Sequence, residues 1–72
     1  MTLTKATDGV KTKITSLEAT HALRGKLAAM GIVPGSEIEV VRGAFHGAYI
    51  IRCRGAEFVL GRGLAHLIHV EG

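Results

Sequence analysis

The chain has 72 residues, of which 47% are hydrophobic and 21% charged, and its formal net charge is +3. This length fits a single domain, residues 1–72, and the composition excludes a disordered chain. The one cysteine excludes an internal disulfide and a paired-cysteine metal framework, and it favours a reducing cytosol. No apolar run approaches the roughly 20 residues that span a bilayer, and the N-terminus lacks a signal-peptide pattern, so we expect neither membrane insertion nor export.

The first predicted strand, Val10–Leu17, interleaves β-branched and charged residues. Two N-caps compete for the start of the helix that follows. Thr15 and Glu18 have the spacing of a capping box, which would start the helix at residue 16. We prefer Thr20 as the N-cap, because the apolar residues after it then share one helix face.

The predicted helix runs from Ala19 or His21 to Met30 and carries an apolar stripe on one face: Leu23, Leu27 and Met30. Gly25 in its interior costs about 1 kcal/mol relative to alanine, so docking of the stripe must hold the helix. Gly31 stands where a residue with positive φ commonly ends a helix.

Pro34 and Gly35 occupy the second and third positions of a predicted type II turn over residues 33–36. The strand Glu37–Arg42 follows, and we expect Ile38 and Val40 to face the core. Residues 43–47 are predicted to form a loop. The helix end and the turn would therefore form a corner that aims this strand.

The next strand alternates inward and outward residues, namely Tyr49, Ile51 and Cys53 against Ile50, Arg52 and Arg54. Gly55-Ala56 is predicted to close a two-residue hairpin, which would pair Arg54 with Glu57. This register leaves Ile50 and Val59 on the outer face, near each other on the diagonal.

A helical turn at residues 61–66 and a closing strand at Leu67–Val70 complete the predicted elements. Four or five short strands, one short helix and tight turns predict a mainly β fold, a small closed or nearly closed barrel. The helix is inserted after the first strand, and the helical turn precedes the last one.

Catalytic and metal-binding signals are weak. Only His66 and His69 have ligand-like spacing, and a change from helix to strand between them would point their rings apart, so we expect no metal and no cofactor. Cys53 falls on an inward strand face and is interpreted as an unreactive packing residue. Gly61-Arg-Gly63 lacks the other glycines and the lysine of a phosphate loop. We therefore predict that the protein is not an enzyme.

An outer surface remains as the candidate site. Phe45 lies in a glycine-flanked loop, and Ile50 and Val59 face outward beside Arg52 and Arg54, which is the composition of a protein-binding patch. Incidental exposure is the alternative. The scattered basic residues suit an acidic protein surface as readily as a nucleic acid, and three aromatic residues offer little stacking surface.

With these elements placed, the sequence resembles the FeoA family over Val10–Val70. The most specific match is Met30-Gly31-Ile32 with Pro34-Gly35, after a short leucine-bearing helix. The other matching residues are typical of small barrels: Leu23, Leu27, Ile38, Val40, Gly55, Leu60, Ala65, Ile68 and Val70. The chain departs from the family at Lys26 and Gly61, where arginine is common, and at residues 44–48, where prolines usually surround a Leu-Gly pair.

The resemblance implies an SH3-like barrel that acts as a cytoplasmic, non-catalytic accessory of bacterial ferrous iron uptake. Its partner would be FeoB, the membrane transporter with a cytosolic GTP-binding domain, which would bring the protein to the inner membrane. Modulation of the GTPase cycle by an exposed arginine is a further expectation, and the sequence does not rank its candidates, Arg24, Arg42, Arg52, Arg54 and Arg62. The expected contact residues are Phe45, Ile50, Val59, Arg52, Arg54, Arg24 and Lys26.

Three other interpretations stay open. The same barrel occurs as a domain of iron- and manganese-dependent repressors, although no helix-turn-helix precedes it here. Residues 34–40 also resemble swapped-hairpin transcription regulators and ribosome-associated barrels, so a nucleic-acid-binding barrel is the second alternative, and its affinity would fall steeply with salt. Weak self-association through the exposed apolar pair is the third, and it would compete with binding of a transporter.

Overall fold

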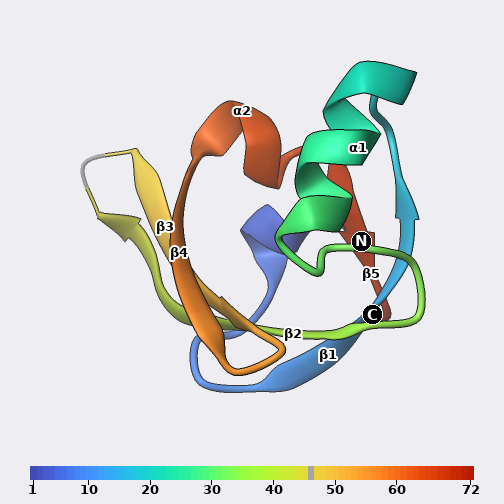
Figure 1. Cartoon of the computed structure of the whole chain (residues 1–72). Coiled ribbons are helices and arrows are strands. Elements are labelled where there is room, and N and C mark those ends of the chain that lie inside the picture. The colour runs from blue at the N-terminus through green and yellow to red at the C-terminus, as the bar shows by residue number, and fades with distance from the viewer. Residues whose placement is uncertain (46) are drawn as a thin grey trace.

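The structure is a computed structural model that describes residues 1–45 and 47–72, with the backbone alone at residues 44 and 45. Within these ranges the chain forms a 3-10 helix, two α-helices and five strands (Figure 1). Their bounds in chain order are η1 (Leu3–Lys5), β1 (Lys11–Leu17), α1 (His21–Ala29), β2 (Glu37–Phe45), β3 (Ala48–Cys53), β4 (Ala56–Gly61), α2 (Arg62–Ala65) and β5 (Ile68–Val70). No helix in the described part is both long and apolar enough to cross a membrane.

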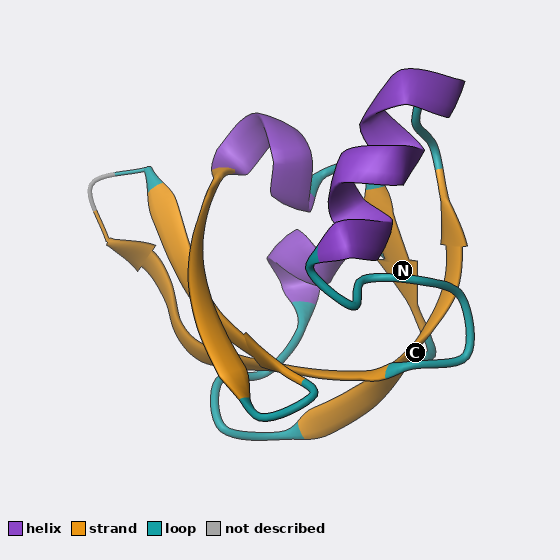
Figure 2. Ribbon diagram, viewed as in Figure 1, coloured by secondary structure: helices purple, strands orange, loops and turns teal. Residues whose placement is uncertain are grey.

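The strands form an antiparallel sheet in the order β4-β3-β2-β1-β5. Figure 2 shows the strands curving around η1, with α1 and α2 together at one end of the curved sheet. Among the described strands, β4 and β5 end the order and do not pair with each other. The predicted mainly β, barrel-like fold is therefore confirmed, with the sheet left open between its two outer strands.

The core is one cluster of apolar side chains supplied by every strand and helix. Ile38 and Val40 of β2 face it as predicted, each 1% exposed. Leu3 and Ile32 are also completely buried. No periodic pattern could predict their burial, because η1 is a single turn and Ile32 lies in the corner between α1 and β2. The remaining buried members are Ile14, Leu17, Leu27, Tyr49, Ile51, Cys53, Leu60, Ala65, Ile68 and Val70.

Helix α1 begins where the preferred cap predicted. The Leu23 amide donates a hydrogen bond of 3.2 Å to Thr20 Oγ1, and Thr20 has the extended backbone of an N-cap. Leu27 is buried, and Leu23 and Met30 pack partly buried against the core. The capping box at Thr15 is therefore not used.

The corner between α1 and β2 also follows the prediction. Gly31 ends the helix with φ +82°. The Ser36 amide donates to Val33 O at 3.1 Å and Gly35 has φ +93°, which is the geometry of a type II turn. Two further hydrogen bonds fix the turn to β1, from the Gly35 amide to Ile14 O at 2.8 Å and from the Ile14 amide to Ser36 O at 2.9 Å.

The predicted loop at residues 43–47 is wrong in its first half, because β2 continues to Phe45, which pairs with Ala48. Register shifts after Val40 and after Arg42 mark irregularities that bend β2 while the pairing continues. Gly43 suits this stretch because a side chain there would approach the Tyr49 ring at 3.2 Å. Phe45 was expected at the tip of this loop, and residue 46, which follows it, lies outside the described residues.

The predicted register of the second hairpin is also wrong. The loop residues are Arg54 and Gly55, with φ of +54° and +81°, and Cys53 pairs with Ala56. Two successive positive φ values give the turn whose twist matches that of the strands. Glu57 consequently lies opposite Arg52, where the prediction placed it opposite Arg54.

Candidate functional site

The candidate surface is the outer face of β3 and β4, where Ile50 lies directly opposite Val59. Val59 is 69% exposed and Ile50 is half-buried. The corrected register makes them direct cross-strand neighbours, which touch more closely than the predicted diagonal pair would. We call Ile50, Val59, Arg52 and Arg54 the outer patch.

The Phe45 side chain, which the sequence placed beside this patch, lies outside the described residues. Its backbone ends β2 opposite Ala48.

A row of alternating charges crosses the sheet beside the apolar pair. Its members lie opposite one another from β1 to β4: Lys11, Glu39, Arg52 and Glu57. The Arg52 guanidinium lies 2.6 Å from Glu57 Oε2 and 3.6 Å from Glu39 Oε1. The hydrogen bond to Glu57, supported by the charges of Glu57 and Glu39, raises the pKa of Arg52 above its ordinary value. Since exposed ion pairs add little stability, the main effect is to fix the direction of Arg52.

Arg54 is held differently, at the tip of the hairpin. A side chain added at Gly31 would meet the Arg54 Cδ at 2.6 Å, so the aliphatic stem of Arg54 lies over Gly31 at the end of α1. A hollow of about 540 Å³ adjoins this tip. Gly35 and Ser36 of the turn line it together with residues of both charges, namely Lys11, Glu37, Glu39, Arg52 and Arg54.

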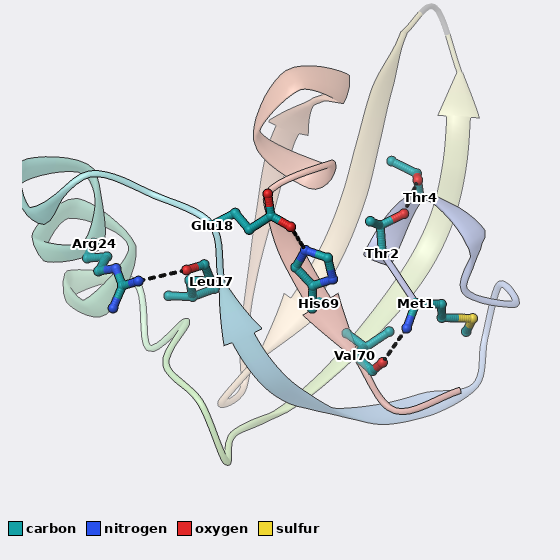
Figure 3. Close-up of polar contacts among 8 residues, drawn as sticks. All are labelled: Met1, Thr2, Thr4, Leu17, Glu18, Arg24, His69 and Val70. Carbon is teal, nitrogen blue, oxygen red and sulfur yellow. Dashed lines mark hydrogen bonds and ion pairs between the residues drawn. The ribbon is translucent and has the colours of Figure 1, made fainter.

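Two basic residues of α1, Arg24 and Lys26, were expected to contact the partner, but they are not part of the outer patch. Arg24 donates from Nη2 to Leu17 O at 2.9 Å, which fastens α1 to the end of β1 (Figure 3). Its Nε also donates to Ala19 O at 3.0 Å. Lys26 is exposed on the last turn of α1. Arg24 therefore has a structural use, and Lys26 belongs to a separate surface.

The two histidines with ligand-like spacing make separate contacts. His69 Nε2 is bonded to Glu18 Oε1, which joins β5 to the segment before α1 (Figure 3). His66 is exposed and caps the end of α2. In the described ranges, no group of three or more His, Cys, Asp or Glu side chains is arranged to hold a metal ion.

Cys53 is 1% exposed, which confirms its predicted inward direction. Its thiol lies 3.4 Å from Gly31 O and 3.3 Å from Glu37 O, so it links β3 to both ends of the corner. Burial raises the pKa of the thiol, and the charge of Arg54 partly opposes this shift. The side chain thus favours its protonated, unreactive form.

Lys11 and Glu39 were not among the residues selected from the sequence. The sequence feature that could have identified them is the alternation of charged and uncharged residues at 11–13 and 37–39. In the structure Lys11 lies opposite Glu39 and Lys13 lies opposite Glu37. Detecting it requires knowing that β1 pairs with β2 in this register, which no local pattern specifies.

The FeoA domain model matches residues 1–72. The putative Fe(2+) transport protein A of Methanocaldococcus jannaschii is 35% identical over 66 residues, which cover 92% of this chain and 79% of that protein. The crystal structure of an iron uptake regulatory protein, FeoA, superposes with a TM-score of 0.88 at 33% identity, covering 97% of this chain and 93% of that one.

Two more distant structures show the shared fold alone. Stenotrophomonas maltophilia FeoA, described as an SH3 domain protein, has a TM-score of 0.84 at 24% identity over 99% of this chain and 89% of that one. A manganese-dependent transcriptional repressor has a TM-score of 0.85 at 24% identity, covering 97% of this chain and 40% of that one. The family-model match spans the whole sequence, so this chain belongs to the FeoA domain family.

Proposed function

We propose that this protein is a non-catalytic, cytoplasmic accessory of ferrous iron uptake that binds the cytosolic region of the FeoB transporter. Membership of the FeoA family supports the role in iron transport, and a relative bears the name Fe(2+) transport protein A. The repressor-domain interpretation has less support, because the likeness to the repressor extends to the fold alone.

The outer patch is the observation that carries the docking proposal. Its apolar centre is the cross-strand pair Ile50 and Val59, and Val59 is 69% exposed. Arg52 forms a charged rim that Glu57 and Glu39 hold in place. An apolar centre with an oriented polar rim is the arrangement of protein interfaces, and a fixed arginine loses less freedom when it binds.

Arg54 is the candidate residue for an effect on GTP hydrolysis. Arg52 is engaged by two carboxylates and Arg24 by two backbone carbonyls. Arg54 is instead an exposed residue at a hairpin tip, and its stem lies over Gly31. An arginine supplied to a GTPase site in trans raises the rate by roughly 10³–10⁵.

The binding test is calorimetric titration of the FeoB cytosolic region with this protein. We expect Ile50→Asp and Val59→Asp to weaken binding at least tenfold, because each places a charge in the apolar centre. Val10→Asp is the matched control, since Val10 is 53% exposed outside the patch. Unchanged binding by both patch variants, with circular dichroism showing intact folding, would overturn the docking surface.

The activity test measures GTP hydrolysis by the same FeoB region with saturating amounts of this protein. We expect Arg54→Ala to remove any stimulation while binding persists, and Arg62→Ala, another exposed arginine, to retain it. Stimulation that survives Arg54→Ala would exclude Arg54 from this role.

A further inference from the structure

The two edge strands of the sheet, β5 and β4, differ in whether another segment covers their outer side. At the β5 edge, the Met1 amino group donates to Val70 O at 3.0 Å (Figure 3). The Val70 amide donates to Met1 O at 2.7 Å, and the backbones of Thr2 and His69 form an antiparallel β-bridge. The N-terminal residues therefore cover that edge. At the other end, β4 pairs with β3 on one side, and no described strand pairs with its second side (Figure 2).

The backbone groups on the free side of β4 belong to alternate residues. Cys53 and Ala56 flank the two-residue turn, so they form a hydrogen-bonded pair, and every second residue of β4 bonds to β3 in turn. The N–H groups of Glu57, Val59 and Gly61 consequently point away from β3. Among the described residues, the backbone hydrogen bonds that lie outside the helices and strand ladders do not engage the Glu57 or Val59 amide either.

The usual protections of an exposed edge are missing from β4. It contains no proline, and its one charged side chain, Glu57, is turned toward Arg52 at 2.6 Å. Lysines, prolines and irregularities normally prevent such an edge from pairing with another chain. Val59, which is 69% exposed, lies in the middle of this unprotected strand.

We propose that the β4 edge binds the β4 edge of a second copy of this chain, antiparallel, about a two-fold axis at Val59. In this register each Val59 amide donates to the carbonyl of the partner's Val59, and each Gly61 amide donates to the carbonyl of the partner's Glu57. These hydrogen bonds use amides that the single chain leaves pointing outward. The Gly61 carbonyl is not needed, so α2 keeps its first turn.

The side chains are complementary in the same register. The two Val59 residues meet on the outer face, flanked by Ile50 of each copy, so the apolar pair becomes a continuous apolar strip. Glu57 faces the partner's Gly61, which has no side chain to obstruct it, next to the partner's Arg62. An acidic and a basic residue thus approach each other twice across the axis.

The contact is small, because only one six-residue strand of each copy takes part. Interfaces well below about 1,200 Å² belong to weak and transient complexes, so the dimer forms at high concentration. This inference does not rest on the proposed function. It predicts in addition that the second copy covers Val59, so dimerisation and transporter binding exclude each other.

The test is sedimentation equilibrium of the purified protein from about 20 μM to 1 mM, the range in which small interfaces associate. We expect the average mass to rise toward that of a dimer with concentration. Val59→Lys should weaken association at least tenfold, whereas Val10→Lys, which adds the same charge at another exposed valine, should retain it. A mass that stays monomeric at 1 mM, or an equal loss in both variants, would overturn the proposal.

A charge test and an exchange test address the register. Arg62→Glu should weaken the dimer by repulsion from the partner's Glu57, whereas Lys26→Glu, with the same change in net charge, should not. Hydrogen exchange followed by NMR should show the Val59 and Gly61 amides gaining protection as the concentration rises. Association that leaves these amides unprotected would place the interface elsewhere, even if the transporter still binds.

Discussion

Alanine substitutions at Gly31 and Gly35 separate two costs of removing a glycine. Both residues have positive φ, +82° and +93°, where an L side chain is strained by about 1–2 kcal/mol. A Cβ at Gly35 meets nothing within 4 Å, whereas a Cβ at Gly31 lies 2.6 Å from the Arg54 Cδ. Moving the Arg54 stem off its preferred rotamer adds about 0.5–1.5 kcal/mol. We therefore expect losses of about 1–2 kcal/mol for Gly35→Ala and about 1.5–3.5 kcal/mol for Gly31→Ala.

The assay is urea unfolding monitored by far-ultraviolet circular dichroism, which yields the free energy of unfolding for each variant. Arg54→Ala provides the decisive comparison, because it removes the stem from above Gly31 and leaves the backbone strain in place. In the Arg54→Ala background, Gly31→Ala should cost no more than Gly35→Ala. Equal losses for the two single variants, or no relief in the double variant, would refute the contact between Arg54 and the helix end.

Further predictions concern the cap, the core and the thiol. Thr20→Ala should lower the unfolding free energy by about 1 kcal/mol, and Thr20→Asn should restore it, as measured by urea unfolding. Leu27→Ala should cost about 2–5 kcal/mol, because the side chain is 1% exposed, and a melting temperature within a few degrees of wild type would show that α1 does not dock through it. Since burial raises the pKa of the Cys53 thiol, iodoacetamide labelling of the native protein should be far slower than in urea and should still be increasing above pH 9. Equal labelling rates in the two states would show that the thiol is accessible.

Local sequence rules predicted those parts of the fold where one residue type decides the geometry. Thr20, Gly31 and Gly35 are such positions, because a hydroxyl cap and positive φ values each have few alternatives. The second hairpin shows where these rules fail. Pairing Glu57 with Arg54 or with Arg52 satisfies charge and alternation equally well, and only the turn decides between them. The turn places Arg54 at φ +54°, a conformation that its residue type does not predict.

The candidate site was predictable in part for a similar reason. Alternation along β3 correctly placed Ile50 on the outer face and Cys53 in the core. The ion pairs of Arg52 and the carbonyl contacts of Arg24 depend on which strands are neighbours and on where α1 packs. Such long-range relations have no local signature, so the sequence could name these arginines without showing which of them is already engaged.

The Arg54 stem over Gly31 and the Cys53 thiol near Gly31 O have a consequence for the dynamics of the molecule. Cys53, the last residue of β3, and Arg54, the first residue of the hairpin turn, contact the residue that ends a helix more than twenty positions earlier in the chain. The tip of the second hairpin and the end of α1 should therefore open as one cooperative unit. Their amides would exchange with a common free energy, and a ligand that steadies the hairpin would slow exchange at the helix end without touching it.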